Sequence, residues 1–325
     1  MPTAHWPVAG HAWAVSQLQR ALEEGRLAQA VLITGPAQVG KATLARALAM
    51  AINCTGAPRP CGACRACLHI AANTHADVRL VTPDGERMKI DQMRDLQREL
   101  SLSPLEARRR VAILDDFDRA TPEAMNALLK TLEEPPSSVV LILIAPEADV
   151  LLPTIVSRCQ VIALRPLTAA QVRAALAGRG VAADRADLLA HLSGGRIGWA
   201  IQAAQDGGIL ERRRARLDDL RQLLNAMRVE RFAYAEALAR KTAQAREAID
   251  LWRTWWRDVM LTSAGSDADM TNVDRREEIA TLSARFDAAR AKSAAEACSQ
   301  ALWQLDKNAA PRLVVEVLLL NLPHQ

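Results

Sequence analysis

Short apolar segments alternate with longer amphipathic segments over the first half of the chain. The apolar segments are rich in Val, Ile and Leu, which is typical of strands buried on both faces of a parallel sheet. The amphipathic segments between them predict helices. We expect strands at 31–34, 78–81, 111–114, 139–144 and 161–164, and helices at 13–24, 44–52, 90–100 and 122–134. This order predicts a parallel α/β domain that ends near residue 165.

The second half of the chain contains helical patterns and no further strand pattern. Short helices are expected at 168–176, 183–192 and 199–204, followed by a Gly-containing linker and a longer helical region marked by stripes of leucine. We therefore expect three parts: an α/β core at 1–165, a small helical domain at 166–207 and an all-helical domain at 208–325.

Length and composition limit the class of protein. A chain of 325 residues is too long for one hydrophobic core, which supports several domains. No apolar run reaches the roughly 18 residues that span a bilayer, and residues 1–7 lack the basic and apolar regions of a secretory signal. The cytoplasm is the expected location. A net charge of +4 is too small for a protein that coats nucleic acid by charge alone, so any DNA contact is expected to be local or shared with partners.

The segment that follows the first strand is nearly a phosphate-binding loop. Gly35, Gly40 and Lys41 have the spacing that lets backbone N–H groups and an ammonium surround phosphate groups. The next position normally carries the hydroxyl that binds Mg²⁺, and here it is Ala42. Thr43 is turned about 100° further around the helix, so it does not replace that hydroxyl. The loop is expected either to hold ATP or ADP without turnover or to be purely structural.

Two acidic residues, Asp115 and Asp116, follow the strand at 111–114. The carboxyl ends of parallel strands meet at one edge of a sheet, so we expect these carboxylates to face the loop around Lys41. The alternative is an ordinary carboxylate that caps a turn. The candidate nucleotide-site residues are Gly35, Gly40, Lys41, Thr43, Asp115 and Asp116.

Four of the six cysteines are crowded together behind the helix of this loop. They are Cys54, Cys61, Cys64 and Cys67. Such crowding in a chain of this size indicates a metal site in a reducing compartment rather than a disulfide framework. Four thiolates predict a closed, structural Zn²⁺ site. An iron–sulfur cluster is a weaker alternative, since Leu68 stands where a ferredoxin-type run has Pro, and unligated thiols are a third.

Two clusters in the helical half could bear on function. Trp252, Trp255 and Trp256 lie on one helical face beside arginines, an arrangement that suits either base stacking or a buried core or interface. The apolar packing interpretation is favoured. The basic run at 212–216 opens a helix and is expected to be a solvated face.

Five segments occur in a specific order along the chain. They are the loop remnant, the Cys quartet, ILDDFDR at 113–119, NALLKTLEEP at 126–135 and LPTIVSRC at 152–159. Together they resemble the clamp-loader subunits of bacterial DNA polymerase III, which are of the AAA+ class. The segment NAAPRL at 308–313 is similar to the family's C-terminal collar helix, so the resemblance covers nearly the whole chain.

The resemblance implies an AAA+ core, a small helical lid and a collar that joins a five-subunit ring with gamma/tau and delta subunits. It implies contact with the sliding clamp and primer–template DNA through that complex, which is part of the DNA polymerase III holoenzyme, a DNA-directed DNA polymerase and nucleotidyltransferase. It also implies that Arg158 reaches the ATP of a neighbouring subunit. An arginine finger supplied in trans can raise the rate by ~10³ to 10⁵.

Three positions depart from the ATPase members of that family, and all three fall in the chain's own site. Ala42 replaces the Mg²⁺ ligand, Asp116 replaces the Glu that positions water, and Gly198 stands where a lid arginine is expected. The alternative is that Arg196, two residues earlier, still reaches a phosphate. Arg158 is retained. We therefore expect a largely non-hydrolysing subunit, a stator, that assists hydrolysis in its neighbour.

Two other functions are compatible with the sequence. An active AAA+ ATPase subunit of the same assembly would turn over ATP as a purified chain. A sequence-independent DNA-binding module would show salt-dependent affinity for primed DNA without partners.

Overall fold

The computed structural model describes residues 6–323, which fold into two compact units. The first unit runs to Ala175 and includes Gly195–Gly198. The second contains Leu176–Gly194 and the chain from Trp199 onward. The expected three-part division at 165 and 207 stays a prediction, and its terminal residues 1–5 and 324–325 lie outside the described residues. Within 6–323, the helices are too short or too polar to cross a membrane.

The first unit is built on a five-stranded parallel sheet with the strand order β2-β3-β4-β1-β5. The strands are β1 (Ala30–Thr34), β2 (Val78–Val81), β3 (Arg110–Leu114), β4 (Val139–Ala145) and β5 (Gln160–Ala163). All five are the strands that the apolar pattern predicts. Because the sheet is parallel, the segments after β1 and β3 emerge at the same edge.

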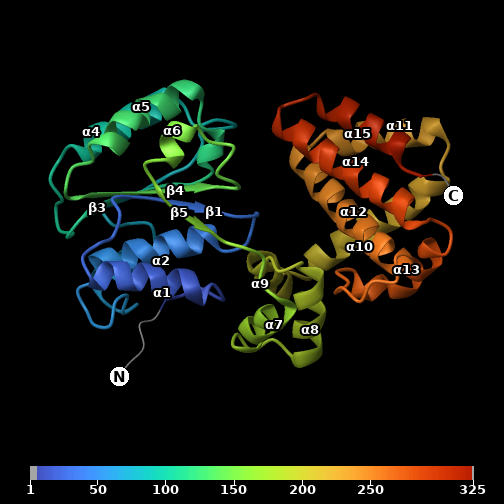
Figure 1. Cartoon of the computed structure of the whole chain (residues 1–325), viewed down its shortest axis with the longest axis horizontal. Helices are drawn as coiled ribbons and strands as arrows, with labels where there is room; N and C mark the ends of the chain where they lie inside the picture. Colours follow the sequence, from blue (N-terminus) through green and yellow to red (C-terminus); the bar gives the residue numbers. More distant parts are fainter. Residues whose placement is uncertain (1–5, 324–325) are drawn as a thin grey trace. The chain divides into compact units, whose positions relative to one another are not determined.

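Helices cover both faces of this sheet (Figure 1). They are α1 (Ala12–Glu23), α2 (Lys41–Asn53), α3 (Arg65–Ala71), α4 (Ile90–Leu100), the 3₁₀ turn η1 (Phe117–Arg119), α5 (Pro122–Glu133) and α6 (Pro153–Val156). Successive side chains of a strand point to opposite faces. Val31 and Ile33 therefore pack with α1 and α2, while Ala30 and Leu32 pack with α4 and α5. The expected architecture, a parallel sheet flanked by helices and followed by helices alone, is confirmed.

The second half of the chain is helical throughout its described residues. The elements are α7 (Ala169–Ala177), α8 (Ala183–Leu192), α9 (Ile197–Gln205), α10 (Gly207–Asn225), α11 (Arg228–Ala239), α12 (Thr242–Ser263), η2 (Val273–Arg275), α13 (Arg276–Ser283), α14 (Ala288–Asp306) and α15 (Pro311–Asn321). Helix α12 contacts each of α10, α11, α13, α14 and α15, so it is the centre of the second unit's core.

The tryptophan cluster of α12 is buried inside that core. Trp252, Trp255 and Trp256 are at most 2% exposed. The Trp252 indole Nε1–H donates to the carbonyl of Arg216, and Trp256 lies edge-on to Phe286 at a centroid distance of 5.8 Å. The core interpretation is confirmed, and base stacking is excluded because the indole faces are not accessible.

The basic run at 212–216 is only partly a solvated face, so that expectation is wrong at Arg213. This side chain is 6% exposed, and its guanidinium bonds Asp274 and Asn272. A charge that is removed from water needs charged and polar partners. The helical register of α10 turns Arg213 inward, where the 3₁₀ turn η2 and its N-cap Asn272 supply those partners.

Candidate functional site

The loop between β1 and α2 requires glycine at two positions. Gly35 has φ +143°, and a Cβ there would lie 2.5 Å from the carbonyl oxygen of Leu164. Gly40 has φ +110° and is the N-cap of α2. Both backbone conformations are strained for residues with a side chain. The loop therefore has the tight strand-to-helix turn of a phosphate-binding loop.

Lys41 closes this loop on itself. Its Nζ donates to the carbonyl oxygen of Gly35 at 2.5 Å and to that of Pro36 at 2.9 Å. Burial lowers the pKa of Lys41, and the nearby carboxylates of Asp116, Asp115 and Asp118 oppose that shift. The ammonium is thus held by its own loop and faces the acidic end of β3.

The acidic residues after β3 lie close enough to Lys41 for their charges to act on it. Burial, together with the charge of Asp116, raises the pKa of Asp115. The same two causes raise the pKa of Asp118. Asp116 itself is exposed and has φ 52°. Asp118 also belongs to this group, although the sequence analysis did not name it as a site residue. Its signal in the sequence was its short distance from Asp115, because the 3₁₀ turn η1 brings its side chain toward Lys41.

Position 42, where a phosphate-binding loop normally carries a hydroxyl, has an apolar side chain and apolar surroundings. Ala42 is half-buried and packs against the apolar cluster under α2. Thr43, the other candidate, is exposed. Successive helical positions are about 100° apart around the axis, so the two side chains point in different directions.

Two contacts that the sequence reasoning missed hold the loop from outside. The His11 Nε2 lies 3.0 Å from the carbonyl oxygen of Val39, which requires a proton on Nε2. The backbone N–H of Gly198 donates to the carbonyl oxygen of Gln38 at 2.8 Å. A Cβ at position 198 would lie 2.9 Å from that same oxygen. Position 198 is therefore next to the loop, and a side chain there would meet the loop backbone.

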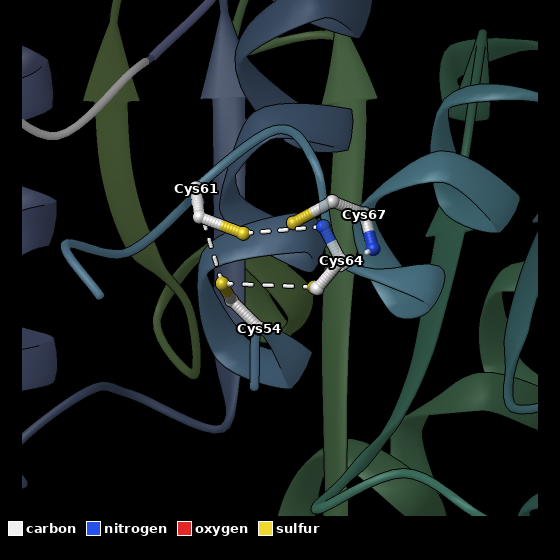
Figure 2. A group of neighbouring side chains, drawn as sticks. All are labelled: Cys54, Cys61, Cys64 and Cys67. Atoms are coloured by element: carbon white, nitrogen blue, oxygen red, sulfur yellow. Dashed lines mark hydrogen bonds between the residues drawn. The ribbon is translucent and has the colours of Figure 1, made fainter. Parts of the chain in front are cut away.

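The four cysteines of the predicted metal site come together at the end of α2 and the start of α3 (Figure 2). Their Sγ atoms all lie within 4.8 Å of one another, and the Sγ atoms of Cys54 and Cys64 are 3.9 Å apart. Tetrahedral zinc with Zn–S bonds of about 2.3 Å places its sulfurs about 3.8 Å apart. The cluster therefore has the ligand set and spacing of a structural zinc site.

Backbone geometry supports thiolates in this cluster. The N–H of Cys61 donates to the Sγ of Cys54, and the N–H of Cys64 donates to the Sγ of Cys61, both at 3.3 Å. Burial opposes ionisation of Cys64, but hydrogen bonds outweigh it and lower its pKa to about 5. Burial raises the pKa of Cys67. A metal is what ionises such buried thiols.

Arg158 lies beyond the short helix α6, and its partners come from α5 and α6. Its Nη1 donates to the carbonyl oxygen of Thr154 at 2.8 Å. Its Nη2 donates to Oε1 of Glu133 at 2.7 Å. The side chain is 35% exposed, so Arg158 lies at the surface although both Nη atoms donate within the chain. Glu133 was not among the predicted site residues.

A parallel α/β core with a glycine-bounded loop, a lysine and carboxylates at one sheet edge defines the P-loop class of nucleotide-binding proteins. Two family models match the chain. One is described as DNA polymerase III, delta subunit, and matches residues 10–168. The other is described as DNA polymerase III, delta subunit, C terminal, and matches residues 209–324.

Sequence relatives agree with these matches. The DNA polymerase III subunit delta' of Bacillus subtilis is 30% identical over 267 residues, which is 81% of this chain and 80% of that protein. The chain belongs to this delta' family, whose members are clamp-loader subunits of the AAA+ class.

Two further similarities cover different shares of the chain. The gamma/tau subunit of Mycobacterium tuberculosis is 35% identical over 179 residues, 54% of this chain and 31% of that protein. The chain thus spans about a third of that relative. Among solved structures, a DNA polymerase III gamma subunit-related protein of Thermotoga maritima superposes with a TM-score of 0.47 at 18% identity. The superposition covers 94% of this chain and 97% of that protein's chain.

Proposed function

We propose that this chain is the stator of a DNA polymerase III clamp loader in DNA replication. It lends Arg158 to the ATP of a neighbouring subunit and does not itself hydrolyse ATP at a useful rate. One asymmetry supports this proposal most strongly. The guanidinium of Arg158 is accessible at the surface, while the chain's own loop has Ala42 in place of the Mg²⁺-binding hydroxyl.

The geometry of the loop supports the same proposal. Lys41 donates to carbonyls of its own loop, so phosphate would have to replace those bonds. Gly198 has no side chain that could reach a bound nucleotide, and a Cβ added there would lie 2.9 Å from the carbonyl oxygen of Gln38. ATP or ADP held here would rest on the N–H groups of the loop, Lys41 and the carboxylates of Asp115 and Asp116, without turnover.

The proposed partners are the gamma/tau and delta subunits in a ring of five, with the sliding clamp and primer–template DNA engaged through the complex. The second unit supplies the proposed collar. Leu313, Val317 and Leu320 form an exposed stripe on α15, with exposed fractions of 61%, 51% and 44%. Positions i, i+4 and i+7 share one helical face, and an exposed apolar stripe of this kind suits a neighbouring collar helix.

The proposed cofactor is one structural Zn²⁺ held by Cys54, Cys61, Cys64 and Cys67. It would tie the end of α2 to α3 and so brace the core. The proposed location is the cytoplasm, because a thiolate zinc site suits a reducing compartment. The proposed domains are a core at 1–165, a lid at 166–207 and a collar at 208–325.

Reconstitution of the complex tests the proposal. The purified chain alone is expected to show no ATP turnover above background. Arg158→Ala is expected to leave assembly intact and to lower the ATPase rate of the complex by ~10³-fold or more. Brisk turnover by the chain alone would instead favour an active ATPase subunit, and unchanged turnover in the R158A complex would contradict a finger in trans.

A further inference from the structure

The side chain of Glu133 holds one arm of the Arg158 guanidinium. Glu133 is the last residue of α5, and Arg158 directly follows the C-cap of α6. The two are 25 residues apart in sequence, yet Nη2 and Oε1 are 2.7 Å apart. The other arm, Nη1, donates to the carbonyl of Thr154. Both arms of the planar guanidinium are therefore tied to this chain, from two different helices.

The position of Glu133 is unfavourable for α5 taken alone. The C-terminal end of a helix carries partial negative charge, so a carboxylate there is destabilising and a cation stabilising. The first turn of α5 has the opposite, favourable pattern, with Glu123 next to the Thr121 N-cap. A carboxylate at the wrong end of an otherwise well-capped helix is compensated by its contact with Arg158.

The pair contributes little to folding. The side chains of Arg158 and Glu133 are 35% and 50% exposed, and ion pairs this accessible to solvent have small effects on stability. The pair instead fixes the orientation of the Arg158 guanidinium, since a long arginine side chain samples many rotamers unless both arms of the guanidinium are held. A finger that must meet a phosphoryl group at a fixed place gains from such prior ordering.

We propose that Glu133 is a positioning residue for Arg158, an inference that rests on the proposed role of Arg158 in trans. The carboxylate of Glu133 accepts one N–H of Nη2, while the Thr154 carbonyl and the Ser157 hydroxyl accept from Nη1 at 2.8 and 3.4 Å. A guanidinium has five N–H donors, so the second N–H of Nη2 and the Nε–H remain for phosphoryl oxygens of the neighbouring subunit's nucleotide. Glu133 itself touches no nucleotide and acts only through Arg158.

The test is a double-mutant cycle in the reconstituted complex, with kcat and KM for ATP measured alongside assembly by size-exclusion chromatography. Glu133→Ala is expected to lower kcat by about 10- to 100-fold, as misplacement of a catalytic group does, with KM and assembly unchanged. Glu133→Gln keeps an oxygen that accepts from Nη2 and is expected to retain most of the activity. In the R158A background, E133A is expected to cause no further loss.

Glu134→Ala is the matched control, because Glu134 is the adjacent, exposed residue of the same type. It is expected to leave kcat unchanged. An E133A complex with normal or raised kcat, or an E133A effect that adds to that of R158A, would overturn the inference. If R158A itself leaves turnover unchanged, the proposed function fails as well; if R158A lowers turnover and E133A does not, only the role of Glu133 fails.

Discussion

The backbone N–H of Gly198 is hydrogen-bonded to the carbonyl oxygen of Gln38, at 2.8 Å, within the first unit. This contact ties the start of α9 to the loop between β1 and α2. It also explains why glycine occupies the position of the expected lid arginine, because the space beside its Cα is filled by the loop backbone.

Gly198→Ala is expected to destabilise the protein by about 1–3 kcal/mol, the usual cost of overpacking a close contact. The added Cβ would lie 2.9 Å from a backbone oxygen, so the loop or α9 must shift. Gly207→Ala is the control, since a Cβ at Gly207 meets nothing within 4 Å. Thermal and urea unfolding of both variants gives the comparison, and equal stability of the two would contradict the close contact.

Cys64→Ser is expected to abolish zinc binding and to lower the melting temperature, because structural zinc contributes directly to folding. Metal analysis of the purified chain is expected to give one zinc per molecule. Cys159→Ser is the control, since Cys159 is half-buried and lies outside the cluster. Iron, or no metal, in the purified wild-type chain would count against the site.

Zinc retention is expected to fall as the pH falls, because protons compete with the metal for thiolates. In the metal-free chain, burial raises the pKa of Cys54, so this thiol must lose a proton to bind the metal at neutral pH. Hydrogen bonds lower the pKa of Cys64 against the effect of burial, from 9.0 to about 5. In the metal-free chain, the Cys64 thiolate thus stabilises the fold fully above pH 9.0, and that contribution is lost as the pH falls toward about 5. Release into a colorimetric chelator measures the profile, and retention independent of pH would rule out thiolate ligation.

The combined change Leu313→Lys and Val317→Lys is expected to weaken assembly about 100-fold or more without unfolding the chain. Both side chains are over half exposed, and burying each in an interface contributes about 1.5–3 kcal/mol. Leu318→Ala on the same helix is the contrasting variant, because Leu318 is 2% exposed and its loss should cost about 2–5 kcal/mol of stability. Normal assembly of the double-lysine variant would exclude this face as the collar contact.

Arg213→Ala is expected to destabilise the second unit by about 3–5 kcal/mol, since it leaves Asp274 and Asn272 without their partner in a buried network. Arg212→Ala is the neighbouring control. The Arg212 side chain is 61% exposed and pairs with Asp206 at 3.5 Å, so its loss should change stability by less than about 1 kcal/mol. Similar unfolding curves for the two variants would contradict the buried network.

Local patterns were sufficient for most of the fold. The apolar segments predicted all five strands because parallel strands buried on both faces leave a continuous apolar signal. The helix expected at 122–134 is α5, and the side chain of its N-cap, Thr121, accepts from the N–H of Ala124. The short helix α3 was not expected, because its 7 residues are too few to show a helical period and they follow a segment rich in Gly, Pro and Cys. Arg213 was misassigned because a run of arginines does not show which of them faces inward.

The sequence by itself determined the strands, the glycine-bounded loop with its missing hydroxyl, and the cysteine quartet, because each of these depends on spacing within a short segment. Only the tertiary structure decided which distant groups meet. The contacts of His11 with Val39, of Gly198 with Gln38 and of Glu133 with Arg158 join segments separated by strands and helices. Such pairs follow from strand order and helix packing, which bring backbone and side-chain groups together regardless of their distance along the chain.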